Sequence, residues 1–310
     1  MKPLFANEIR GNWATLLLPI RPDDSIDYDL LGAGLDYFIN ARVNGVYSNG
    51  TAGEFYTQTE DEFDRVNTLL AEKCNAAGMP FQIGAAHPCA QIARERIRRS
   101  KHLAPSAYQV TLPDWFPPAL DEAVNFLEVM AAEAAPIPLI VYNPPHAKRK
   151  LAPPEWAVIA ERVPGVAGMK VPGGDEAWYA AMRPLMGRFS IFIPGHLLHI
   201  GLARGAHGAY SNVACLNPKF AQAWYELCLS DPEAGAALGA RIEAFWEAHI
   251  VPIITKHGHS NMAADKTVAV AGGWLPGLTT RLRWPYASPT NDHALKIGEA
   301  ARAALPGAFY

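Results

Sequence analysis

Short apolar runs alternate along the chain with longer segments in which apolar and polar residues follow a helical period. The apolar runs are rich in β-branched residues and recur at intervals of roughly 25 to 30 residues, which predicts repeated strand–helix units. Helical periodicity is present in segments 61–76, 120–135 and 175–186. Eight strands are expected, at residues 14–20, 45–48, 81–85, 108–112, 139–142, 166–171, 189–193 and 208–211.

Residues at the expected helix starts agree with this pattern. Asp27 precedes the first helical segment, where its side chain can cap free N–H groups. Thr59 stands three residues before Glu62, the spacing of a capping box. Pro153 and Pro154 lie where a later helix opens, a position that proline favours.

The order of the elements predicts the fold class. Eight strand–helix units without a G-x-G-x-x-G turn after the first strand favour a closed α/β barrel, the (β/α)8 or TIM barrel, over an open doubly wound sheet. We expect this barrel over residues 1–230. Residues 231–310 contain helical patterns at 232–254, 261–271 and 292–305, which predict a C-terminal helical extension without a separating linker.

Composition and charge exclude several classes of protein. The 310 residues are 50% hydrophobic, enough for one barrel-sized core. A net charge of −3 and the lack of a long basic run argue against a nucleic-acid partner. The early apolar run at 13–20 is too short for a membrane span and follows no signal-peptide pattern. We therefore expect a soluble, cytoplasmic protein without a membrane partner.

Cysteine and histidine spacing gives weak support to a metal site. His196 and His199 have an i, i+3 spacing compatible with metal ligation, but no third ligand with suitable spacing follows, so no metal is expected. His257 and His259 fall in a polar loop and are expected at the surface. Four cysteines without C-x-x-C spacing are expected to be buried free thiols: Cys74, Cys89, Cys215 and Cys228.

Three features fall at the ends of expected strands, where barrels carry catalytic residues. The glycines of the turn NGTAGE, residues 49–54, let backbone N–H groups converge on an anion, although a plain tight turn fits equally well. Tyr142 ends the fifth strand before a YNPP loop, and simple packing is its alternative role. Lys170 lies in an otherwise apolar strand. Burial disfavours its ammonium form and favours a nucleophilic amine, unless the side chain reaches solvent or an acid.

The chain resembles the dihydrodipicolinate synthase / N-acetylneuraminate lyase family of Schiff-base class I aldolases. The resemblance rests on three motifs that follow one another along the chain: the turn NGTAGE, the loop YNPP and the strand sequence GMK. The opening GNWATLLLPI, the segment HGAYSNVA and the terminal RLRWP extend the resemblance through most of the chain, as in a divergent member. The resemblance implies a (β/α)8 barrel with a C-terminal helical extension. It also implies a homo-oligomer, tetramer or dimer, that needs no metal or cofactor.

The resemblance also implies roles for individual residues. Lys170 would form a Schiff base with pyruvate or another 2-oxo acid, because an iminium accepts the electron pair of a neighbouring bond that breaks. Tyr142 matches the tyrosine that transfers protons near the imine, and Thr51 matches the hydroxyl that passes a proton to it. The backbone N–H groups of Thr51 and Ala52, in the turn after Gly50, would bind the carboxylate.

Four positions depart from the family pattern. Ala52 replaces a second turn hydroxyl, so the carboxylate loses one side-chain hydrogen bond. Trp115 stands where synthases offer a tyrosine, which breaks the third member of the proton relay. Ala147 occupies the position of an arginine that holds a substrate carboxylate. Tyr210 replaces an aliphatic residue and is a candidate substitute phenol, so Trp115 and Tyr210 join the candidate substrate-binding residues.

These observations predict a class I lyase or aldolase that joins Lys170 to pyruvate or a related 2-oxo acid, with an aldehyde as a second substrate. Three alternatives remain open. The first is a 4-hydroxy-tetrahydrodipicolinate synthase, and the second is a dehydratase or deaminase that uses the same imine. The third is a non-catalytic protein that binds a 2-oxo acid.

Overall fold

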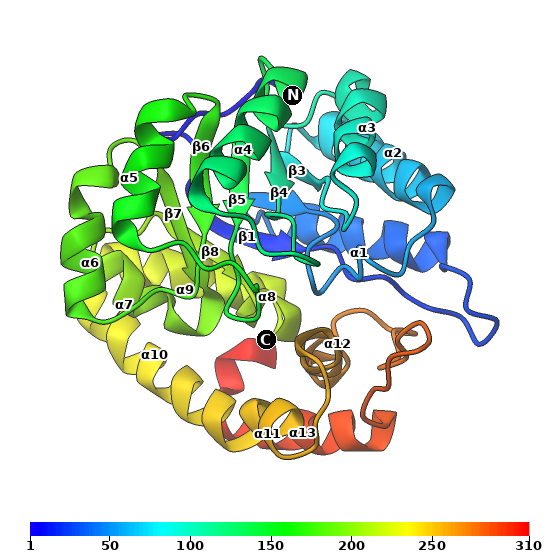
Figure 1. The fold of residues 1–310 in the computed structure, drawn as a ribbon. Helices are drawn as coiled ribbons and strands as arrows, with labels where there is room; N and C mark the ends of the chain where they lie inside the picture. Colours follow the sequence, from blue (N-terminus) through cyan, green and yellow to red (C-terminus); the bar gives the residue numbers. More distant parts are fainter. Residues whose placement is uncertain (310) are drawn as a thin grey trace.

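Eight parallel strands form a closed barrel in chain order in this computed structural model, which describes residues 1–309. Each strand pairs with the next, and the last pairs with the first. The prediction of a (β/α)8 barrel is confirmed (Figure 1). The strands are β1 (Gly11–Thr15), β2 (Gly45–Tyr47), β3 (Phe81–Gly84), β4 (Ala107–Val110), β5 (Leu139–Tyr142), β6 (Val166–Lys170), β7 (Ser190–Pro194) and β8 (Gly208–Ser211).

Helices connect consecutive strands and surround the barrel (Figure 1). The predicted helix starts are confirmed. Asp27 accepts a hydrogen bond from the N–H of Leu30, and Thr59 and Glu62 form the capping box. The connecting helices are α1 (Tyr28–Asn40), α2 (Glu60–Ala77), α3 (Ala90–Ser100), α4 (Leu120–Ala134), α5 (Pro153–Arg162), α6 (Glu176–Met182) and α7 (Leu198–Ala203), and β8 is followed by α8 (Val213–Leu216) and α9 (Pro218–Ser230).

The C-terminal part of the chain adds four helices: α10 (Pro232–Phe245), α11 (Val251–Thr255), α12 (Asn261–Gly272) and α13 (Asn291–Ala304). Figure 1 shows them together on the side of the barrel away from the N-terminus. A Cβ atom at Gly272 would lie 1.7 Å from the carbonyl oxygen of Leu216, so glycine is required for this close approach of α12 to α8. Because α8 follows β8, the contact anchors α12 near the C-terminal ends of the strands. Tyr310 lies outside the described residues.

The first strand lies earlier than predicted. β1 covers Gly11–Thr15, so the prediction of 14–20 overlaps it by only two residues. Leu16, Leu17 and Leu18 are buried although they follow the strand, and Leu16 lies against the turn that contains Gly53. The apolar run therefore reflects burial of the loop after β1, not continued strand pairing.

Aromatic side chains fill the inside of the barrel. Trp13, Tyr47, Phe192 and Tyr210 are almost fully buried in one cluster. The ring centroids of Tyr47 and Tyr210 are 4.6 Å apart, and those of Trp13 and Tyr210 are 6.2 Å apart. This packing closes the interior, so chemistry is left to the strand ends.

The four cysteines are unpaired. Burial is confirmed for Cys74, Cys215 and Cys228, but the expectation is wrong for Cys89, which is exposed where α3 begins. Helix starts lie at the surface, and this position outweighs the tendency of cysteine to be buried. None of the helices within residues 1–309 is both long enough and apolar enough to span a bilayer.

Candidate active site

Lys170 ends β6 directly beside Tyr142, the last residue of β5, because the strand register pairs these two residues. The Lys170 Nζ atom lies 4.5 Å from the centroid of the Tyr142 ring, 5.7 Å from that of Tyr210 and 5.8 Å from that of Tyr47. The faces of aromatic rings attract an ammonium group over such distances. Three tyrosines therefore hold the amine at the mouth of the barrel.

The turn after β2 brings a hydroxyl group to the same place. Thr51 Oγ1 is 3.1 Å from the hydroxyl oxygen of Tyr142, within hydrogen-bond distance, although 91 residues separate them. A Cβ atom at Gly50 would lie 2.8 Å from the Tyr47 ring, so only glycine fits there. The N–H groups of Thr51 and Ala52 donate to no protein acceptor within residues 1–309, which leaves both available to an anion.

A cavity of about 440 Å³ opens beside Thr51 and Tyr142. Its wall combines the loops after β2, β3, β4 and β5 with the C-terminal extension. Barrel loops alone would therefore not enclose it. The residues that surround it include Phe55, Tyr56, His87, Leu112, Pro113, Asp114, Pro144, His146, Ala147, Arg149, Ile254, His259, Ser260, Asn261 and Tyr286.

Two histidines on the cavity wall have lowered pKa values. Desolvation lowers the pKa of His146, and the positive charge of Lys170 lowers it further. Desolvation also lowers the pKa of His87, with a further contribution from Arg96. Both imidazoles are therefore neutral at pH 7, so neither adds a positive charge to the cavity.

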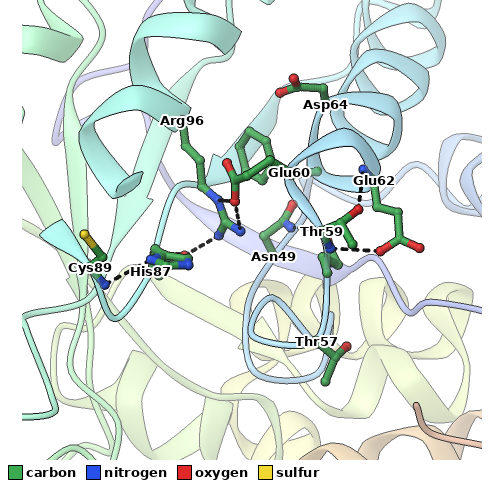
Figure 2. Close-up of polar contacts among 12 residues, drawn as sticks. Asn49, Thr57, Thr59, Glu60, Glu62, Asp64, His87, Cys89 and Arg96 are labelled. Atoms are coloured by element: carbon green, nitrogen blue, oxygen red, sulfur yellow. Dashed lines mark hydrogen bonds and ion pairs between the residues drawn. The ribbon is translucent and has the colours of Figure 1, made fainter. Parts of the chain in front are cut away.

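A buried arginine supports the loop that carries His87. Figure 2 shows Arg96 of α3 directed toward Glu60 at the start of α2. Its Nε and Nη2 atoms donate to Glu60 Oε1 at 3.0 and 2.7 Å, and Nη1 donates to the carbonyl oxygen of Ala86 at 2.5 Å. This contact joins α2, α3 and the loop after β3, and so stabilises one wall of the cavity.

Among the sequence candidates, Thr51 and Tyr142 line this cavity. The others lie outside its lining: Gly50, Ala52, Trp115, Lys170 and Tyr210. Trp115 is 86% exposed on the loop after β4. Tyr210 is buried inside the barrel, where its hydroxyl donates to Gln82, although its ring remains near Lys170. Of the cationic residues after Tyr142, Lys148 donates to the carbonyl oxygen of Trp115, and Arg149 pairs with Glu155.

The two histidines considered as possible metal ligands, His196 and His199, contact different partners. The Nδ1 atom of His196 lies 2.8 Å from the Asn212 amide, and His199 Nε2 lies 3.2 Å from Glu243. No group of three His, Cys, Asp or Glu side chains suited to a metal occurs in the described part of the chain. His257 is exposed, as expected, and His259 is partly exposed where it lines the cavity between the extension and the barrel.

Sequence reasoning missed two ionisable residues on α12. Lys266 is fully buried and its Nζ atom lies 2.5 Å from Glu54 Oε1, which is buried as well. Its neighbour Asp265 is partly buried and interacts electrostatically with Lys170. The signal was present, because these adjacent charges interrupt the apolar segment 262–272.

The fold and this group of residues define a (β/α)8 barrel with a lysine, tyrosine and threonine at the C-terminal ends of its strands. The chain belongs to the dihydrodipicolinate synthetase family, whose model matches residues 8–304. This assignment confirms the family that the turn, loop and strand motifs indicated.

Curated relatives of this chain are lyases. It is 31% identical to N-acetylneuraminate lyase of Rhizobium meliloti (strain 1021) over 209 residues. This alignment covers 65% of this chain and 67% of that protein. It is 28% identical to trans-O-hydroxybenzylidenepyruvate hydratase-aldolase of Sphingobium xenophagum, over 56% of this chain and about half (54%) of that protein.

The fold also matches solved structures. One is YagE from E. coli K12, a prophage protein of the dihydrodipicolinic acid synthase family in complex with pyruvate. It has a TM-score of 0.83 and 17% identity, and covers 96% of this chain and 98% of that one. At this identity the likeness concerns the fold alone.

Proposed function

We propose that the chain is a class I lyase that forms a Schiff base between Lys170 and pyruvate or a related 2-oxo acid. The observation that carries the proposal is the position of the Lys170 amine beside Tyr142, whose hydroxyl contacts Thr51. The amine adds to the carbonyl carbon, and water leaves as the imine forms. The iminium then accepts the electron pair of the bond that breaks one carbon away.

Neighbouring groups bind the acid and move protons. The N–H groups of Thr51 and Ala52, in the turn that Gly50 makes possible, bind the substrate carboxylate, in place of the side-chain donor that Ala52 lacks. Tyr142 exchanges protons with the carbinolamine that precedes the imine, and its contact with Thr51 gives that proton a path toward the cavity. No cofactor takes part in these steps.

The cavity favours an apolar second substituent on the 2-oxo acid. Phe55, Tyr56 and Tyr286 contribute aromatic surface to its wall. Ala147 supplies no cation for a second carboxylate, and the Arg149 guanidinium is paired with Glu155. An aromatic aldehyde is therefore the proposed second substrate, and the name of the Sphingobium xenophagum relative supports it. The same features disfavour aspartate semialdehyde, the substrate of the synthase alternative.

Borohydride reduction in the presence of pyruvate tests the Schiff base. We expect one stable pyruvate adduct per chain in the intact mass, mapped to Lys170 by peptide analysis, because reduction converts the imine into a secondary amine. An adduct only with a larger 2-oxo acid would show that Ala52 changes the choice of acid. If the folded protein forms no adduct with any 2-oxo acid, the lyase proposal is wrong. The alternative of a non-catalytic protein that binds a 2-oxo acid then remains.

The preference among aldehydes tests whether the second substrate is aromatic. With pyruvate present, we expect kcat/KM for 2-hydroxybenzaldehyde to exceed that for N-acetylmannosamine or aspartate semialdehyde at least about 10-fold. The aromatic part of the wall favours the aromatic ring, and within residues 1–309 the wall offers no unpaired arginine or lysine to a carboxylate. Phe55→Ala should reduce this preference. Phe116→Ala is the matched control, because Phe116 is 82% exposed outside the cavity. A preference for either polar aldehyde would contradict the assignment.

A further inference from the structure

Helix α12 presents a carboxylate to the site that none of the steps above uses. Asn261, in the first turn of α12, lines the cavity. Asp265 follows four residues later and so lies on the same face of the helix. The Asp265 carboxylate is close enough to Lys170 for their charges to interact.

Asp265 has no structural partner that would explain its position. The adjacent cation, Lys266, is already engaged, since its Nζ atom donates to Glu54 at 2.5 Å and to the carbonyl oxygen of Arg281 at 2.8 Å. Within residues 1–309, no group donates a hydrogen bond to the Asp265 carboxylate, which stays partly accessible. A desolvated carboxylate without hydrogen bonds costs stability. A role in the reaction would account for it.

The groups that interact electrostatically with Asp265 come from four different parts of the chain. They are Lys170 of β6, Tyr47 of β2, Tyr56 of the loop after β2 and Cys215 of α8. Lys170 is the one cation among them. Burial raises the pKa of Asp265 from 3.8 to about 6, and the charge of Lys170 opposes this rise. A carboxyl group with such a pKa accepts and returns a proton readily near neutral pH.

We propose that Asp265 is the base that removes a proton from C3 of the 2-oxo acid bound to Lys170, and the acid that returns it. The inference rests on the proposed Schiff base. A carboxylate oxygen takes the C3 proton, the C–H electron pair becomes the C2–C3 double bond, and the iminium electron pair moves to nitrogen to give the enamine. Reversal restores the imine, so no other reactant is consumed.

This assignment also supplies a proton-transfer group in a chain whose proton relay lacks its third member, a tyrosine. Trp115 cannot donate a transferable proton and lies exposed, away from the cavity. In this chain helix α12 of the C-terminal extension supplies a proton acceptor instead. Asp265 thereby acts on carbon, whereas Tyr142 and Thr51 act on the oxygen lost as water during imine formation.

Exchange of the pyruvate methyl protons with D2O tests the proposal without a second substrate. Proton NMR follows the loss of the methyl signal, and borohydride trapping measures the imine separately. We expect Asp265→Asn to slow exchange at least about 100-fold while trapping on Lys170 persists. Asp265→Glu should recover part of the exchange. Glu299→Gln, an exposed change on α13, is the control and should leave both signals unchanged.

The pH profile gives a second readout. Exchange by the unmodified chain should rise through about pH 6 as the carboxylate ionises, because only the ionised form accepts the proton. Asp265→Asn should lose this rise. His146 also lies near Lys170 and titrates below 6.5, so a rise that persists in Asp265→Asn belongs to His146 and overturns the proposal.

Two further outcomes would also overturn it. Exchange by Asp265→Asn at the unmodified rate would show that the carboxylate does not act on C3. Equal loss of trapping and exchange in the folded variant would mean that Asp265 only holds the site together. If the unmodified chain traps no 2-oxo acid, the Schiff base itself fails, so the two proposals are tested separately.

Discussion

Replacement of Lys170 by arginine is expected to abolish the pyruvate adduct and to slow methyl-proton exchange at least about 1,000-fold, the scale of loss seen when a covalent nucleophile is removed. The guanidinium group stays protonated at all accessible pH values and cannot attack a carbonyl carbon. It keeps the positive charge among the rings of Tyr47, Tyr142 and Tyr210, so the fold should persist.

Trapping, proton exchange and thermal unfolding of the Lys170→Arg variant are measured on one preparation. Lys150→Arg is the matched control, because it makes the same change at an exposed position of the loop after β5. Exchange within about tenfold of the unmodified rate would show that another group carries the chemistry, and the assignment of Lys170 would be wrong.

Lys266→Met is expected to lower the free energy of unfolding by about 3–5 kcal/mol, the usual cost of leaving one member of a buried ion pair alone. Both side chains of the Lys266–Glu54 pair are fully buried, so water cannot solvate the Glu54 carboxylate once the ammonium is gone. The N–H of Arg283 still donates to Glu54 at 3.2 Å, but it brings no charge to the carboxylate oxygen.

Urea unfolding of single and double variants measures this effect. The double variant Glu54→Gln, Lys266→Met removes both charges and should recover much of the stability lost by Lys266→Met alone. Lys296→Met on the exposed face of α13 is the control and should change stability by less than about 0.5 kcal/mol. A loss below about 1 kcal/mol for Lys266→Met would contradict the buried pair.

The same pair bears on catalysis. Glu54 ends the turn that carries Thr51, and Lys266 stands next to Asp265 on α12. The ion pair therefore ties the turn of the carboxylate site to the helix that carries the proposed base. We expect its loss to disturb both parts of the site together.

Much of the fold could be read from local patterns. The capping box of Thr59 and Glu62 and the N-cap of Asp27 depend on residues three positions apart, so the sequence alone identifies them. The first strand was misplaced, since burial of the loop after β1 made Leu16–Leu18 as apolar as a strand. An apolar run reports burial, and only pairing with β2 and β8 shows where the strand ends.

The candidate site was predicted unevenly. Lys170 and Tyr142 stand out locally, because each interrupts or ends an apolar strand. Asp265 and Lys266 also interrupt an apolar segment, but nothing local shows what they meet. The partner of Lys266 and the place of His259 at the cavity arise from the packing of the C-terminal helices against the barrel. Nor could the sequence show that Tyr210 turns into the barrel interior toward Gln82.

The sequence by itself determined the strand–helix repeat, the helix starts, the family and the residues at the strand ends, because all of these follow from patterns within short stretches of chain. Tertiary structure alone decided which residues meet. Closing the barrel sets the register that pairs Tyr142 with Lys170, and the turn after β2 then reaches the Tyr142 hydroxyl. Packing of α12 on α8 brings Asp265 to the same place from the other end of the chain, through contacts that no local pattern encodes.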